Sequence, residues 1–226
     1  MKSILLYDLY SVESKIRDNE LNECWNWNSR INFSSIFIYG DKYTSLSIES
    51  SAVHTGDPTR LTFGKFLSIV DYNRGTDGVA ILTNSDIKLD PLLIEVTHGL
   101  PVGVLLAISR YEMTGMIASN PWCTQDTWVL RLQPIHKPLM TTASFSLGSP
   151  GCELRFAELM HSAGFSVYNP CLSFRNIHLH KQASIHKVED THFGAYIFSH
   201  PCEYSDVIAC DPAKSGKVVY YRKGYS

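Results

Sequence analysis

Short apolar runs alternate with longer amphipathic stretches along the first two-thirds of the chain. Val79-Ala80-Ile81-Leu82 is an unbroken apolar run, typical of a strand buried on both faces, and residues 102–108 have the same character. A β-rich run occupies Ser35–Tyr39. The stretch from Pro58 to Gly75 instead spaces its apolar residues at helical intervals, with Asp57 placed to cap it. This alternation predicts an α/β fold with a mainly parallel central sheet flanked by helices.

Other expected elements complete one domain. They are strands at 4–10 and 165–168 and helices at 12–28, 92–97 and 149–164. From Lys181 onward the periodic pattern weakens. We therefore expect a catalytic domain over residues 1–181 and a C-terminal extension, 182–226, packed on that same domain.

Composition narrows the class of protein. With 226 residues, 44% of them hydrophobic, the chain can bury a sizeable core. Its net charge of -2 gives no general attraction to nucleic acid or anionic membranes. No apolar run approaches the roughly 18–20 residues of a membrane span, and Asp8 breaks the N-terminal one, so a cytoplasmic location is expected. The six cysteines lack C-x-x-C spacing, which favours buried thiols over a disulfide framework.

Polar side chains follow two of the expected buried strands. Asn84-Ser85-Asp86 comes directly after one strand, and Arg110 follows the next. In open α/β sheets, ligands bind beyond the carboxyl ends of the strands. A carboxylate at Asp86 suits a hard divalent cation that bridges diphosphate oxygens. The alternative is a simple Asx turn leading into a helix that Asp90 caps.

A second cluster combines aromatic and polar residues. Gln125 and Asp126 lie between Trp122 and Trp128, which together suit a polar organic ligand. Asp126 is a candidate general base that takes a proton from an acceptor hydroxyl. The structural alternative is a loop carboxylate that caps the following segment, and the pattern does not separate the two.

Two further groups carry weaker signals. Glu153 and Arg155 lie at the start of an expected helix, where the helix dipole favours anions, although dipole compensation and a solvated arginine explain them equally well. His178 and His180 share a face if they lie on a strand, so both imidazoles can reach one metal ion. The alternative is one packed and one exposed histidine.

The order of these motifs is more specific than any one of them. Six segments occur in succession: 82–87, 108–111, 125–128, 148–153, 164–170 and 178–180. This succession resembles small GT-A-like glycosyltransferases over roughly residues 78–181, whereas the first 77 residues match only in coarse pattern.

The resemblance implies a single GT-A-like, Rossmann-like domain that transfers a sugar with inversion. The donor would be a nucleotide-diphosphate sugar, the cofactor Mn²⁺ or Mg²⁺, and the acceptor a hydroxyl of a glycan, lipid, protein or modified nucleic acid. Asp86 would bind the metal ion with His178 or His180, and Asp126 would be the base, with Glu153 as the second catalytic carboxyl group.

Substrate binding is expected from five side chains: Asn84, Arg110, Gln125, Trp128 and Arg155. Two departures from the family pattern stand out, since Asn84 replaces the first acid of D-x-D and Glu153 stands where Asp is expected.

Three other functions compete with glycosyl transfer. A related nucleotidyltransferase uses a similar sheet-end metal, but residues 1–40 contain no Gly-rich phosphate loop. A non-catalytic carbohydrate- or nucleotide-binding module would use Trp122 and Trp128 as its binding surface. A metal-dependent hydrolase would use His178 and His180.

Overall fold

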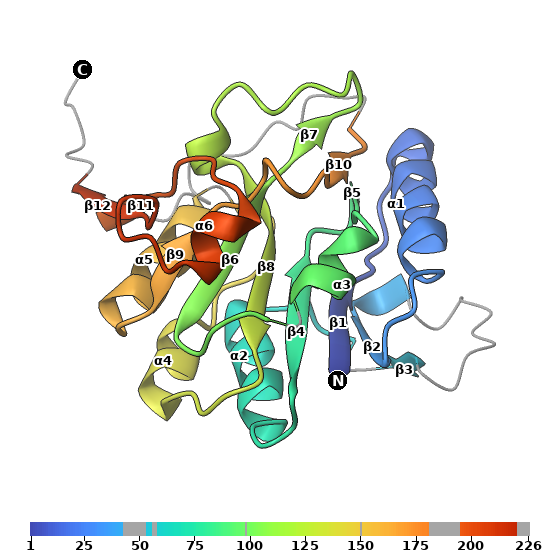
Figure 1. Ribbon diagram of the computed structural model, residues 1–226. Coiled ribbons are helices and arrows are strands. Elements are labelled where there is room, and N and C mark those ends of the chain that lie inside the picture. The colour runs from blue at the N-terminus through green and yellow to red at the C-terminus, as the bar shows by residue number, and fades with distance from the viewer. Residues whose placement is uncertain (43–52, 56–57, 98, 150, 181–194, 221–226) are drawn as a thin grey trace.

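A seven-stranded sheet forms the centre of the computed structural model, which describes residues 1–220 except 43–52, 56–57, 98, 150 and 181–194 (Figure 1). In spatial order its strands are β3 (Val53–Thr55), β2 (Ser35–Tyr39), β1 (Lys2–Asp8), β4 (Gly78–Thr83), β8 (Gln125–Arg131), β6 (Val104–Ser109) and β9 (Ser166–Tyr168). All adjacent pairs are parallel except the two that include β8. The predicted mainly parallel sheet is confirmed.

Helices cover both faces of this sheet, as predicted. The helices are α1 (Lys15–Asn28), α2 (Phe63–Tyr72), α3 (Leu92–Thr97), α4 (Lys137–Thr142), α5 (Cys152–Ser162) and α6 (Tyr204–Ile208), with a 3₁₀ turn η2 (Pro121–Cys123). Successive strand residues point to opposite faces. Ile4 and Leu6 therefore pack toward α2 and α5, and Leu5 and Tyr7 toward α1 and α3.

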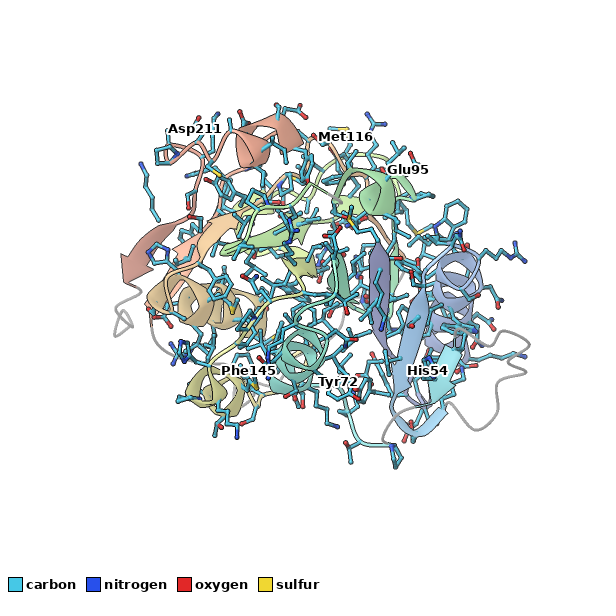
Figure 2. All side chains as sticks on the ribbon, turned by 60° about the horizontal axis from the view of Figure 1, so that its bottom comes forward. His54, Tyr72, Glu95, Met116, Phe145 and Asp211 are labelled. Carbon is cyan, nitrogen blue, oxygen red and sulfur yellow. The ribbon has the colours of Figure 1, made fainter. Side chains whose placement is uncertain are left out.

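Side chains fill the layers between the sheet and the surrounding helices (Figure 2). On the α2 and α5 side, Phe63 stacks on Phe156 with ring centroids 4.3 Å apart, and Phe145 packs beside Phe63. The six cysteines are free thiols, and four are buried, which agrees with the expectation from their spacing. No helix in the described part of the chain is long and apolar enough to cross a bilayer.

Two smaller sheets complete the part of the fold that the structure describes. One pairs β5 (Ile87–Lys88), β10 (Ile177–His178) and β7 (Tyr111–Glu112) at the end of the molecule opposite the N-terminus (Figure 1). The other is a hairpin of β11 (Ala195–Phe198) and β12 (Lys217–Tyr220). Ile197 of β11 is buried in the same core as α5. The division of the chain at residue 181 stays a prediction.

Two expected helix starts were wrong, and the position of Asp126 excludes one of the two alternatives left open for it. The helix expected from Pro58 begins at Phe63, because the Thr62 hydroxyl accepts a hydrogen bond from the backbone N–H of Lys65; Asp57 lies outside the described residues. Asp126 lies within strand β8, where a loop was one alternative. Helix α5 begins after Gly151, whose φ of 79° is left-handed, rather than with a cap at Ser149, and Pro150 lies outside the described residues.

The close pairing of β1 and β4 depends on Gly78. A Cβ at this position would lie 2.0 Å from the backbone oxygen of Lys2, so the strands would have to separate. We expect Gly78→Ala to destabilise the protein by roughly 1–3 kcal/mol through overpacking, measured as a lower urea midpoint with unchanged slope. Gly99→Ala is the matched control, because its Cβ would make only an ordinary 3.6 Å contact with Ile208. Equal midpoints for both variants would contradict this account.

Candidate active site

A pocket of about 590 Å³ opens at the carboxyl edge of the parallel strands. Strand β8 runs in the opposite direction, so its amino end meets the carboxyl ends of β4 and β6 at this edge. The lining residues are Asp8, Tyr10, Arg17, Arg60, Asn84, Ser85, Asp86, Arg110, Asp126, Trp128, Leu147, Gly148, Ser149, Cys152, Glu153, His178 and His180. The side chains expected at two separate strand ends thus share one pocket.

Asp86 is fixed in the turn between β4 and β5. Its backbone oxygen accepts a hydrogen bond from the N–H of Leu179 at 2.8 Å. The backbone oxygen of the preceding residue, Ser85, accepts a hydrogen bond from the Tyr7 hydroxyl at 2.5 Å. These contacts tie the turn to β1 and to the segment that carries the two histidines. The carboxylate is therefore held in place rather than free to adapt.

The Asp86 carboxylate is buried and ionised. Oδ2 accepts a hydrogen bond from Arg17 Nη2 at 2.5 Å, and it lies 3.1 Å from His178 Nε2. Burial works to raise the pKa of Asp86, but His178 and Arg17 outweigh it and hold the pKa well below its usual range. Burial likewise opposes charge on His178, yet the hydrogen bond to Asp86 raises the pKa of that ring.

Asp86, His178 and His180 form a group that fits a metal ion. One ligand atom from each lies within 4.8 Å of the others. The two imidazole rings stack with centroids 5.1 Å apart, although only His178 lies within a strand, β10. His178 Nδ1 and His180 Nε2 are buried without a hydrogen-bond partner among the described residues. One carboxylate and two imidazoles suit a transition metal such as Mn²⁺ better than Mg²⁺.

Asp126 lies beside this group, with both carboxylate oxygens engaged. Oδ1 accepts a hydrogen bond from Asn84 Nδ2 at 2.5 Å, and Oδ2 accepts one from Arg110 Nη1 at 2.9 Å. Arg110 Nε also donates to Glu112 at 3.1 Å. Burial raises the pKa of Asp126, and the charge of Arg110 opposes that shift. These contacts make Asp126 a fixed anchor for Arg110.

Glu153 lies in the first turn of α5 and lines the pocket. Burial raises the pKa of its carboxyl group to about 7, against the opposing effects of its own backbone N–H and of Arg110, while the negative charge of Asp126 raises it further. A carboxyl group with a pKa near neutral pH is suited to accept or donate a proton.

Three charged residues of the pocket were not predicted from the sequence: Asp8, Arg17 and Arg60. Asp8 ends β1, and its Oδ2 accepts from Arg60 Nε at 2.6 Å, while Oδ1 has no partner among the described residues. Arg60 also lies 4.0 Å above the Tyr10 ring. Asp8 could have been predicted, because ligands bind beyond the carboxyl ends of strands and Asp8 ends the first strand just as Asp86 follows β4. Arg17 and Arg60 follow no such rule.

Two expected substrate-binding residues do not line the pocket. Gln125 is buried and donates to the Trp122 backbone oxygen at 2.9 Å. Arg155 pairs with Glu158 one turn along α5. Trp128 does line the pocket, but it is fully buried and serves mainly as core. We therefore do not assign Gln125 or Arg155 to substrate binding.

No protein-family model matches the sequence, and no curated protein matches it. Among solved structures, the chain is similar to a 2-C-methyl-D-erythritol 4-phosphate cytidylyltransferase from Francisella tularensis, with 13% identity, a TM-score of 0.43, and coverage of 84% of this chain and 96% of that chain.

Two further solved structures show similarly remote likeness. A 4-diphosphocytidyl-2C-methyl-D-erythritol synthase from Anaerococcus prevotii shares 8% identity, with a TM-score of 0.49 and coverage of 84% and 92%. A Mycobacterium tuberculosis H37Rv protein in complex with manganese shares 11%, with a TM-score of 0.40 and coverage of 80% and 93%.

Proposed function

We propose that the chain is a divalent-metal-dependent transferase that acts on a nucleotide-activated substrate. The observation that carries this proposal is the group of Asp86, His178 and His180 in a pocket that also holds the arginines Arg17 and Arg110. When bound there, a metal ion neutralises charge on phosphate oxygens as it develops. Arginine side chains complement such a site because their planar forks fit phosphate oxygens.

Glu153 is the better candidate for the proton acceptor. Both oxygens of Asp126 already accept hydrogen bonds from Asn84 and Arg110. Glu153 lines the same pocket with a pKa of about 7, which matches the operating range of a general base. We assign proton transfer to Glu153 and the positioning of Arg110 to Asp126.

Glycosyl transfer is the specific reaction that this base favours. An acceptor hydroxyl must lose its proton as it attacks an anomeric carbon, and direct attack from the face opposite the nucleotide inverts that carbon. Asn84 and Arg110 are placed to contact the donor in this scheme, because both line the pocket that holds the metal group. The donor would be a nucleotide-diphosphate sugar.

Nucleotidyl transfer is the second candidate. The same metal group and arginines suit a nucleoside triphosphate, and cytidylyl transfer is the activity in the name of one of the solved structures above. An acceptor that is itself a phosphate needs no base, so Glu153 would have no role in that reaction. The two reactions therefore differ in their products and, where the nucleotidyl acceptor is a phosphate, in their need for Glu153.

One assay separates these possibilities. The protein is incubated with Mn²⁺ and either a panel of nucleotide-diphosphate sugars or the four nucleoside triphosphates, and the products are identified by mass. Nucleoside diphosphate release with sugar transfer indicates a glycosyltransferase, and pyrophosphate release indicates a nucleotidyltransferase. We expect EDTA to abolish turnover because charge neutralisation at the phosphates is lost.

Other outcomes would refute the proposal. Ligand binding that EDTA does not weaken, with no turnover of any donor, would show a non-catalytic binding module. A thermal-shift screen of the same compounds provides the binding measurement, since a ligand that binds the folded state raises its stability. Turnover that is unaffected by EDTA would remove the metal from the mechanism.

A further inference from the structure

Arg17 occupies the side of the metal group where a cation would bind. Nη2 of its guanidinium donates to Asp86 Oδ2 at 2.5 Å, and Nη1 lies 3.0 Å from His180 Nδ1. One side chain from α1 thus spans two of the three proposed metal ligands. A guanidinium has no acceptor, so His180 Nδ1 must be the acceptor in this contact.

This contact uses the only lone pair that the His180 ring offers. A neutral imidazole has one acceptor nitrogen, and the other nitrogen carries the proton. With Nδ1 accepting from Arg17, Nε2 carries the proton and neither nitrogen is free to coordinate. Coordination through Nδ1 displaces the arginine directly. Coordination through Nε2 moves the proton to Nδ1, which then faces the guanidinium as a second donor. A metal ion and the Arg17 contact therefore exclude each other at His180.

We propose that Arg17 is an internal cation that competes with the divalent metal ion for Asp86 and His180. This inference rests on the proposed metal site. Arg17 is also held by Glu20 Oε2 at 3.1 Å and by the Leu179 backbone oxygen at 3.2 Å. These anchors keep the guanidinium beside the site after it leaves His180. The competition lowers the affinity for free metal ion, because a charged hydrogen-bonded pair must first be broken.

The experiment measures Mn²⁺ binding without any nucleotide, from the electron paramagnetic resonance signal of the free ion. We expect Arg17→Met to bind Mn²⁺ roughly tenfold to a hundredfold more tightly than the wild type, since a hydrogen bond to a charged group no longer has to be broken. Arg60→Met is the matched control. It removes the same charge from the same pocket, but Arg60 pairs with Asp8 at the end of β1.

The outcomes are distinct. Tighter binding for Arg17→Met with a clearly smaller change for Arg60→Met supports direct competition. Equal tightening in both variants shows a general charge effect and overturns it. Measurable but unchanged affinity in Arg17→Met overturns the competition and leaves the metal site intact. No Mn²⁺ binding by any variant overturns the metal site as well.

A second variant covers the case in which Arg17→Met does not fold, which circular dichroism would show. Arg17→Lys keeps the positive charge, but a single ammonium group lacks the fork that spans Asp86 and His180. We expect several-fold tighter Mn²⁺ binding for this variant. Affinity equal to that of the wild type would overturn the competition.

Discussion

Replacing Asp86 by Asn is expected to lower the transfer rate by about a thousandfold or more, because a metal ion contributes several kcal/mol to charge stabilisation. Asp86 supplies the only carboxylate of the proposed ligand group, and its pKa lies well below its usual range, so it is anionic at any working pH. Asn keeps the shape of the side chain but removes the charge. Mn²⁺ affinity should fall together with the rate.

The control is Asp77→Asn. Asp77 is also a carboxylate paired with an arginine, Arg131, but it lies at the opposite end of β4, where its backbone oxygen meets Lys2. Mn²⁺ binding and turnover should match the wild type in this variant. If Asp86→Asn retains wild-type turnover that still requires Mn²⁺, Asp86 is not a metal ligand and the proposed site is wrong.

The sequence predicted the elements of the fold more closely than their boundaries. The β4 run from Val79 to Leu82 is apolar on both faces, and this local property is enough to place it inside a sheet. The antiparallel direction of β8 is not encoded locally. It depends on pairing with β4 and β6, which are 42 or more residues and about 20 residues away in the chain. Local sequence patterns therefore do not predict that Asp126 reaches the pocket from the start of a strand.

The site was predicted most directly where a strand end contributes to it. Asp86 and Arg110 follow buried strands, and the geometry of a parallel sheet brings such positions together. Arg17 projects from α1 and Arg60 precedes α2, so their places depend on how those elements pack. Gln125 was expected at the site but does not line the pocket. Its chemistry suits a ligand, but strand alternation turns its side chain toward Trp122.

Replacing Glu153 by Gln is expected to lower the transfer rate by about 10²–10⁴-fold, the usual contribution of a general base. The wild-type rate should rise as pH increases through about 7 and then level off, because the base must be deprotonated. Gln does not titrate, so the residual rate of the variant should lose this rise. A nucleotidyltransferase that uses a phosphate acceptor would show neither effect.

Replacing Glu153 by Gln should also stabilise the protein above neutral pH, because the pKa of the Glu153 carboxyl group is raised in the folded state. The Glu153 carboxyl group titrates near 4.5 when unfolded and at about 7 when folded. Between those values the folded state holds a proton that the unfolded state has lost, so stability falls as pH rises through this window. Below pH 4.5 both states are protonated, and the penalty is absent. At pH 8 the wild type carries a partly desolvated charge that the variant lacks.

We therefore expect Glu153→Gln to exceed the wild type by roughly 1–3 kcal/mol in unfolding free energy at pH 8, and by much less at pH 5. Urea unfolding at the two pH values measures this difference. Glu95→Gln is the control, since Glu95 lies exposed on α3 (Figure 2) and should give no pH-dependent difference. A gain for Glu153→Gln that is equal at both pH values would show that packing, not buried charge, is responsible. Lower activity together with higher stability at pH 8 is the combination that a desolvated catalytic carboxylate predicts and a structural one does not.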